Sequence, residues 1–270
     1  MHPYFVSFRP GIQMEENLPP YESARDAKTR ELLRNAAGVL LPEHVAPWRY
    51  KDLTECAKEW FPRLETRFRY HGKTKQTRLF RLLGTRHPES LLFDTPRQLQ
   101  AFFNENGSPW GYPLVLKGDK GGGGSTVYPI RAPEDLPGYL KELPEGEPLL
   151  LQRFVEHGGK DLRVVVYGSR TVSYFRVGDG RFYNNICRGG RLEHDAWPEL
   201  QEKGRRAVRD FCRLARIDIA GFDLMFPDDG DPVFVEINYH FGRKGLGGAP
   251  GHREYLGQAI ADWRERCLKT

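Results

Sequence analysis

The chain has 270 residues, which is enough for one large domain or two smaller ones that share a cleft. Hydrophobic residues make up 39% and charged residues 29%, and no apolar run reaches the length of a membrane span, so the composition excludes a disordered chain and predicts no membrane partner. The net charge of +5 suits anionic ligands, but it is too mild and too evenly spread to predict a nucleic-acid partner.

The first residues lack a basic stretch followed by a long apolar segment, so no secretory signal is predicted. The four cysteines lie far apart and lack CxxC spacing, which argues against a zinc site or a disulfide framework. We therefore expect a cytoplasmic protein with free thiols.

Alternating apolar patterns in residues 1–72 predict a short N-terminal α/β lobe, a small sheet flanked by helices. Its expected elements are strand 4–8, helix 23–36, strand 38–41 and helix 50–61.

Residues 73–270 are expected to form a second, larger domain. It opens with helices 74–83 and 95–104. A lid subdomain at about 108–150 then contains strands 113–117 and 127–130, helix 133–143 and the start of strand 149–155. A C-terminal core subdomain at about 151–270 contains strands 162–167, 171–177, 221–226 and 232–237 with helices 197–213 and 254–268.

A glycine-rich loop, residues 118–126, joins the first two lid strands. Backbone amides without side chains can approach phosphate oxygens closely, and Lys117 at the end of the preceding strand adds a positive charge. The GxxxxGK[ST] pattern is missing, which excludes a P-loop. A mobile turn and an exposed strand-end lysine are the alternative interpretation.

Asp223, Glu236 and Asn238 lie inside two apolar strands joined by a short turn. Buried carboxylates need a partner, and Glu236 and Asn238, two residues apart, project to the same face of their strand. Three oxygen ligands suit Mg²⁺. A salt bridge from Glu236 to an arginine is the alternative.

Two further polar segments are candidates for ligand binding. Arg176 and the segment from Asn184 to Gly190, which contains Asn185 and Arg188, offer forked donors that match carboxylate or phosphoryl oxygens. Asp161 could accept from ribose hydroxyls. A polar loop and a structural ion pair explain these residues equally well.

In this order, the segments from about Lys75 to Asn238 resemble the ATP-grasp superfamily, and among its branches the RimK-type amino-acid ligases. The resemblance implies an α/β (α+β) fold in which two α+β subdomains grip ATP. It implies metal ligands for Mg²⁺, or alternatively Mn²⁺, at Asp223, Glu236 and Asn238, and catalytic roles for Arg188 and Arg176. The ATP contacts that it implies are Lys75, Lys117, Gly121, Gly124, Gln152, Arg153, Phe154, Val155, Asp161 and Asn185.

The resemblance also implies a function, an ATP- and Mg²⁺-dependent ligase that joins a carboxylate to an amine or a thiol through an acyl phosphate. Its substrates would be small-molecule or peptide carboxylates and amines. The protein could form a homo-oligomer. The alternatives are a phosphotransferase on the same scaffold and a catalytically silent ATP-binding module. The chain departs from the family pattern after Asn238, so the substrate is not predicted.

Overall fold

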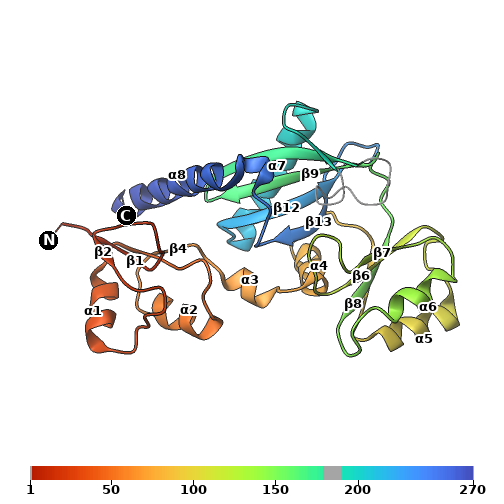
Figure 1. Ribbon diagram of the computed structural model, residues 1–270, viewed down its shortest axis with the longest axis horizontal. Helices are drawn as coiled ribbons and strands as arrows, with labels where there is room; N and C mark the ends of the chain where they lie inside the picture. Colours follow the sequence, from red (N-terminus) through yellow and green to blue (C-terminus); the bar gives the residue numbers. More distant parts are fainter. Residues whose placement is uncertain (1, 179–189, 270) are drawn as a thin grey trace.

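The computed structural model describes residues 2–178 and 190–269, which form three units along the chain (Figure 1). The first is a lobe with a parallel sheet in the order β2-β1-β3-β4. Its two central strands, β1 and β3, are fully buried because helices pack on them and apolar side chains fill the space between. The elements are β1 (Phe5–Ser7), β2 (Glu16–Asn17), α1 (Ala27–Asn35), β3 (Gly38–Leu40), α2 (Pro47–Thr54) and β4 (Trp60–Phe61).

Two helices lead from this lobe to the rest of the chain, α3 (Glu65–Arg69) and α4 (Lys73–Leu82). Figure 1 shows them in the middle of the molecule, between the N-terminal lobe and the other two units. α4 buries Leu79 and Phe80 in the same apolar cluster as the core sheet, so it belongs structurally to the larger domain.

The lid unit is an antiparallel sheet in the order β5-β8-β6-β7, covered by two helices. Because β5 pairs with β8, the sheet begins near residue 90, earlier than the lid boundary expected at about 108. Leucines from strands and helices fill its interior. The elements are β5 (Ser90–Phe93), α5 (Pro96–Asn106), β6 (Leu114–Gly118), β7 (Val127–Ile130), α6 (Asp135–Leu140) and β8 (Leu149–Arg153).

The core unit contains a larger antiparallel sheet in the order β11-β10-β9-β12-β13. Side chains alternate along β9, so Leu162, Val164 and Val166 pack under α7 and α4. On the opposite face, Val165 and Tyr167 pack under α8. The elements are β9 (Lys160–Tyr167), β10 (Arg170–Val177), β11 (Arg191–Glu193), α7 (Pro198–Ala215), β12 (Ile219–Met225), β13 (Val233–Asn238), the 3₁₀ turn η2 (Lys244–Leu246) and α8 (Gly248–Lys269).

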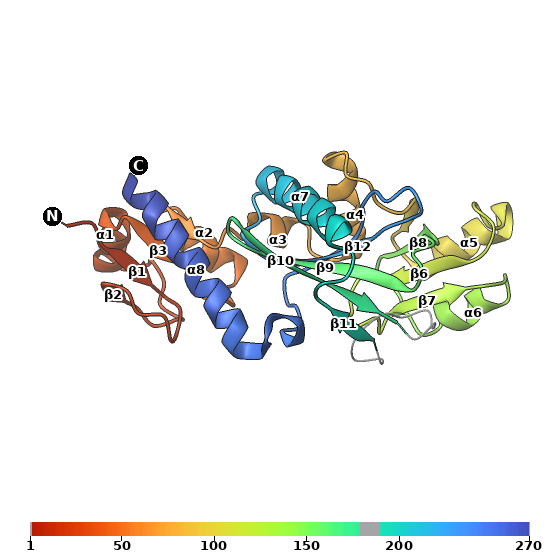
Figure 2. The same ribbon diagram turned by 90° about the horizontal axis from the view of Figure 1, so that it is seen from above.

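The C-terminal helix α8 joins the core sheet to the N-terminal lobe, and Figure 2 shows it crossing that lobe. The Trp263 ring lies 5.5 Å from Phe5 and 5.8 Å from Phe61, measured between ring centroids. A Cβ on Gly38 would lie only 2.6 Å from Trp263, so β3 needs glycine at this contact. The N-terminal lobe is therefore held by residues from both ends of the chain. No helix in the described parts of the chain has the length and apolarity that crossing a membrane requires.

Candidate functional site

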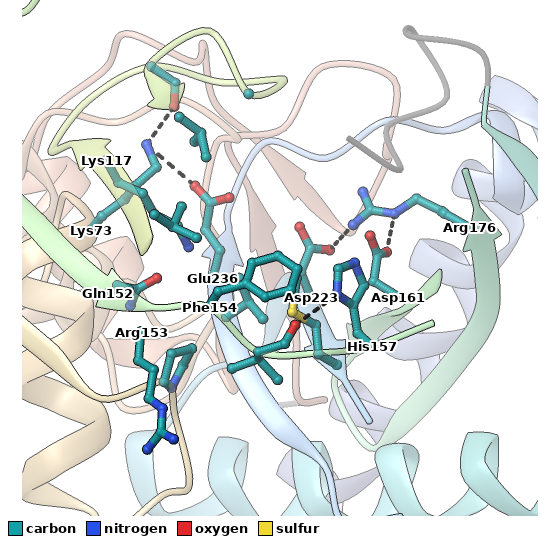
Figure 3. Close-up of a pocket in the computed structure, with 18 residues that line it drawn as sticks. Lys73, Lys117, Gln152, Arg153, Phe154, His157, Asp161, Arg176, Asp223 and Glu236 are labelled. Carbon is teal, nitrogen blue, oxygen red and sulfur yellow. Dashed lines mark hydrogen bonds and ion pairs between the residues drawn. The ribbon is translucent and has the colours of Figure 1, made fainter. Parts of the chain in front are cut away.

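A pocket lies between the lid sheet and the core sheet, and both contribute to its walls (Figure 3). β6, β7, β8 and the glycine loop supply one wall, β9, β10, β12 and β13 the other, and α4 adds one lysine. The pocket combines an apolar lining with a charged one, as a nucleotide requires. The apolar lining residues are Pro88, Val115, Val127, Phe154, Val155, Met225 and Val235, and the titratable ones other than Arg153 are Lys73, Lys117, His157, Asp161, Arg176, Asp223 and Glu236.

Residues 152–155, which the resemblance implies as ATP contacts, line this pocket at the end of β8. Buried Gln152 donates from Nε2 to Ser90 Oγ at 2.9 Å, which holds β8 against β5. The Arg153 guanidinium binds the Glu89 carboxylate at 2.8 Å and is exposed. Because these two side chains are engaged elsewhere, a base in this part of the pocket would contact the main chain and the apolar side chains of the segment.

Two lysines reach the charged part of the pocket. Lys73 Nζ donates to the Gly121 carbonyl at 2.9 Å and lies 3.8 Å from Glu236 Oε1. Burial lowers the pKa of Lys117 to about 8, although the negative charge of Glu236 opposes the shift. An anionic ligand would stabilise the charged form of Lys117, so this part of the pocket favours phosphate oxygens.

Lys75, the helix lysine that the resemblance implies as an ATP contact, lies on the exposed side of α4 and is not among the described residues that line the pocket. Lys73 and Thr77 share the buried face of α4 with Phe80, because residues three or four apart lie on one side of a helix. The helix therefore brings Lys73 to the pocket in place of Lys75.

The glycine loop is closed by a threonine. Gly121 has a φ of +107°, and a Cβ at this position would lie 2.7 Å from Thr126 Oγ1. Gly124 also has a positive φ, of +78°. Thr126 Oγ1 donates to the Lys120 carbonyl at 2.6 Å, so Thr126 holds the two sides of the loop together. Glycine is needed at 121 for both conformation and space.

Asp119 anchors the glycine loop to α4, a role that sequence reasoning missed. Its Oδ1 accepts from the Thr74 amide at 2.8 Å and from Thr74 Oγ1 at 2.6 Å, while its carbonyl accepts from the Lys73 amide at 3.1 Å. A Cβ on Gly72 would overlap the Asp119 carboxylate. The available signal was the start of the predicted helix at Thr74, because first-turn amides require acceptors.

The three predicted metal ligands lie close to one another on β12 and β13. Asp223 pairs directly with Glu236 across the two strands, and a bulge follows Asp223. Asn238 donates from Nδ2 to Asp223 Oδ2 at 3.1 Å. Asp223 and Glu236 line the pocket between the two sheets, whereas Glu236 and Asn238 line the cavity beside it. Glu236 thus lies at the boundary between the two cavities.

Asp223 is also the centre of a buried ion-pair cluster. Arg163 Nε contacts Asp223 Oδ1 at 2.5 Å and Arg176 Nη2 contacts the same oxygen at 3.0 Å. Burial alone would raise the pKa of Asp223, but the two guanidinium groups hold it at about 2. Arg176 Nε also donates to Asp161 Oδ1 at 2.5 Å, so Asp161, expected to bind ribose, is engaged by an arginine. Asp161 thus has the geometry of a structural ion pair, which was the alternative to a ribose contact.

The donor set of this site fits a hard divalent cation. It provides two carboxylates and a side-chain amide oxygen, which are the ligand types that Mg²⁺ takes together with water and nucleotide phosphates. Burial raises the pKa of Glu236, whose nearest cation is Lys73 at 3.8 Å, so a bound cation would stabilise its ionised form. In the described parts of the chain, no three histidine, cysteine, aspartate or glutamate residues form a group that could hold a metal ion.

Two predicted residues, Asn185 and Arg188, lie outside the described residues. Arg176, the other predicted catalytic arginine, lines the pocket from β10. It is therefore the described candidate for contact with a transferred phosphoryl group.

Part of the chain is similar in sequence to known proteins. No family model matches the chain. Beta-citrylglutamate synthase B of Danio rerio is 32% identical over 141 residues, which are 51% of this chain and 34% of that protein. N-acetylaspartylglutamate synthase A of Homo sapiens is 33% identical over 141 residues, which are 51% of this chain and 35% of that protein. The matched region thus spans about a third of the length of these curated relatives.

Solved structures extend the comparison to most of the chain. The crystal structure of a RimK domain protein ATP-grasp from Sphaerobacter thermophilus superposes with a TM-score of 0.59 at 17% identity, covering 84% of this chain and 81% of that one. At this identity the likeness shows the fold, and the predicted fold class is confirmed. The shared architecture shows that the chain has the ATP-grasp fold, and about half of its sequence is similar to the two curated synthases.

Proposed function

We propose that this chain is an ATP- and Mg²⁺-dependent ligase that joins a carboxylate to an amine through an acyl phosphate. The observation that carries the proposal is the meeting of Lys73, Lys117 and Glu236 in one pocket under the glycine loop. Cations that neutralise phosphate and acids that hold magnesium are the two requirements of phosphoryl transfer, and here they share one site.

The bound nucleotide would extend from the apolar segment at residues 154–155 to the two lysines. Asp223, Glu236 and Asn238 would hold Mg²⁺, which supplies neutralisation of the charge on the phosphates. Lys73, fixed to the loop by its bond to the Gly121 carbonyl, would hold the phosphoryl group in line with the attacking carboxylate. Lys117 would contribute a second positive charge in a buried setting where electrostatic attraction is strong.

The reaction balances without a covalent enzyme intermediate. A carboxylate oxygen attacks the γ-phosphorus and ADP leaves; the amine then attacks the acyl carbon, the bond from that carbon to the phosphate oxygen breaks, and inorganic phosphate and a proton leave. Arg176, held by Asp161 and Asp223, would stabilise the charge on the acyl phosphate and on the tetrahedral species. Arg188, implied by the family pattern, is proposed for the same role. The loop would exclude the water that hydrolyses acyl phosphates.

The printed names of the curated relatives suggest the first substrates to test, because both relatives are synthases of glutamate amides. The assay incubates the protein with ATP, Mg²⁺, L-glutamate and a panel of carboxylates, and measures ADP, phosphate and the mass of the product. A ligase gives an amide with one ADP and one phosphate per turnover. Release of ADP with a stable phosphorylated product would indicate the phosphotransferase alternative instead.

Hydroxylamine provides a second test, because it traps acyl phosphates as hydroxamates. A hydroxamate that forms from the carboxylate and ATP, without the natural amine, supports the acyl-phosphate route. ATP binding without ADP release for any carboxylate in the panel would favour a silent ATP-binding module.

A further inference from the structure

A second cavity, of about 270 Å³, lies where the N-terminal lobe meets the core unit. We call it the arginine cavity, after the three arginines that line it. They come from three separate segments, with Arg9 after β1, Arg67 on α3 and Arg243 before η2. Glu43, His240 and His252 line the same space.

The positive charge of the arginine cavity exceeds its negative charge. Glu43 accepts from Arg9 at 2.9 Å through Oε2 and lies 3.5 Å from Arg243 through Oε1, so one carboxylate serves two guanidinium groups. Arg67 Nη2 instead lies 2.8 Å from His240 Nε2, and within residues 2–178 and 190–269 it forms no ion pair with a carboxylate. Three arginines therefore face a single acid.

Burial makes this excess charge costly without a ligand. The Arg9 side chain is only 10% exposed. Burial lowers the pKa of both Arg9 and Arg67, and the neighbouring Arg243 adds to the effect on Arg9. Buried charges are normally paired, so an anion in this cavity would offset the cost of desolvating these groups.

The two histidines of the cavity would add hydrogen-bonding groups. Burial, followed by Arg243 and Arg9, lowers the pKa of His252. His252 is further engaged through Nδ1 by the Tyr167 hydroxyl at 2.6 Å, which leaves Nε2 for a ligand or solvent. The cavity thus combines forked cationic donors with imidazole groups, a set that suits carboxylate oxygens.

The cavity beside the nucleotide pocket, described above, has a volume of about 260 Å³ and shares lining residues with both that pocket and the arginine cavity. It shares Arg67 and His240 with the arginine cavity, and Lys73 and Glu236 with the nucleotide pocket. Asn238 lines it as well. A substrate held in the arginine cavity could therefore extend toward the proposed site of phosphoryl transfer.

We propose that the arginine cavity binds the non-reacting carboxylates of a substrate with two or more carboxylates, whose reacting carboxylate extends toward Glu236 and Asn238. This inference rests on the proposed function and adds the substrate class and the residues that select it. The cationic groups lie in two places, Arg9 and Arg243 around Glu43 and Arg67 at His240, and this arrangement fits separate carboxylates better than one compact phosphate.

The test measures equilibrium binding by calorimetry at constant ionic strength, with citrate, glutarate, N-acetylaspartate and L-glutamate as probes and inorganic phosphate as competitor. The wild-type protein is expected to bind at least one polycarboxylate. Arg67→Gln and Arg243→Gln are each expected to weaken that binding about tenfold or more, the scale of a charge-assisted hydrogen bond. Arg170→Gln is the matched control, because Arg170 pairs with Asp262 on the surface at 2.7 Å and its side chain is 47% exposed.

Circular dichroism checks that each variant folds, and Arg67→Lys, which keeps the charge but loses the fork, is expected to restore part of the affinity. The proposal is overturned if no polycarboxylate binds, if the arginine variants bind like Arg170→Gln, or if phosphate binds as tightly as the best polycarboxylate.

Binding of Mg²⁺–ATP, measured on the same samples, separates this proposal from the proposed function. If ATP binds and no polycarboxylate does, the assignment of the arginine cavity fails alone. If a polycarboxylate binds through the arginines and ATP does not, the cavity assignment stands as an anion site while the ligase proposal fails.

Discussion

Replacing Lys117 with methionine should stabilise the nucleotide-free protein while it weakens ATP binding. The shift of the Lys117 pKa from 10.5 to about 8 corresponds to about 3 kcal/mol of unfavourable free energy for keeping the ammonium group charged in the folded state. Methionine has a similar length and no charge, so Lys117→Met removes this cost. The same variant removes a cation from the proposed phosphate site, so the dissociation constant for ATP should rise by at least about tenfold.

The difference in stability between Lys117→Met and the wild type should depend on pH. The folded-state pKa of Lys117 is lower than its unfolded-state value, so the folded protein binds fewer protons between about pH 8 and pH 10.5. The cost is present in full below pH 8 and falls away as the pH rises to 10.5. The advantage of Lys117→Met over the wild type should therefore be largest at pH 7 and small near pH 10.

Urea unfolding at pH 7, 8, 9 and 10 measures this difference, and Lys51→Met, at a side chain that is 75% exposed, is the control. The control should change the free energy of unfolding by no more than about 0.5 kcal/mol. A Lys117→Met protein that is less stable than the wild type at pH 7, or whose advantage does not shrink with pH, would refute the reasoning. Such a result would mean that Lys117 is already paired in the nucleotide-free protein.

Three further variants test the charged part of the pocket. Glu236→Gln keeps the size of the side chain but removes a proposed metal ligand, so carboxylate-dependent ADP release should fall at least about a hundredfold; a rate near that of the wild type would remove Glu236 from the metal site. Asp119→Ala leaves the Thr74 amide and hydroxyl without their acceptor, so urea unfolding should show a loss of about 1–3 kcal/mol, and an unchanged midpoint would contradict the anchoring role. Gly121→Ala places a Cβ against Thr126 at a φ of +107° and should raise the KM for ATP, whereas Gly122→Ala, which meets no atom within 4 Å, should leave it nearly unchanged; equal effects of the two alanines would show that the loop conformation is unimportant.

Part of the site was predictable because local patterns suffice to describe it. An acid between apolar residues on a short strand, as at Asp223, must meet a cation, and a strand partner joined by a short turn, such as the one that carries Glu236, must lie beside it. The sequence likewise placed Lys117 at the end of a buried strand before the glycine loop.

The choice between Lys73 and Lys75 depended on the rotation of α4 about its axis. Counting back from Phe80 in steps of three and four residues gives Thr77 and Lys73, so helical periodicity alone predicts that Lys73 lies on the buried face. The family pattern instead indicated Lys75. Asp161 raised a different difficulty, because its partner Arg176 lies opposite it on the next strand. An ion pair and a ribose contact have the same local sequence, and only the strand register distinguishes them.

The amino-acid sequence by itself determined the order of the elements, the ATP-grasp resemblance and the residue types at the charged end of the pocket, because these follow from short-range periodicity and spacing. Tertiary structure decided which charges pair with one another, how α8 ties the N-terminal lobe to the core, and that Arg9, Arg67 and Arg243 share one cavity. Arg9 and Arg243 are separated by most of the chain, and their meeting depends on the packing of the lobe against the core sheet, which no local pattern encodes.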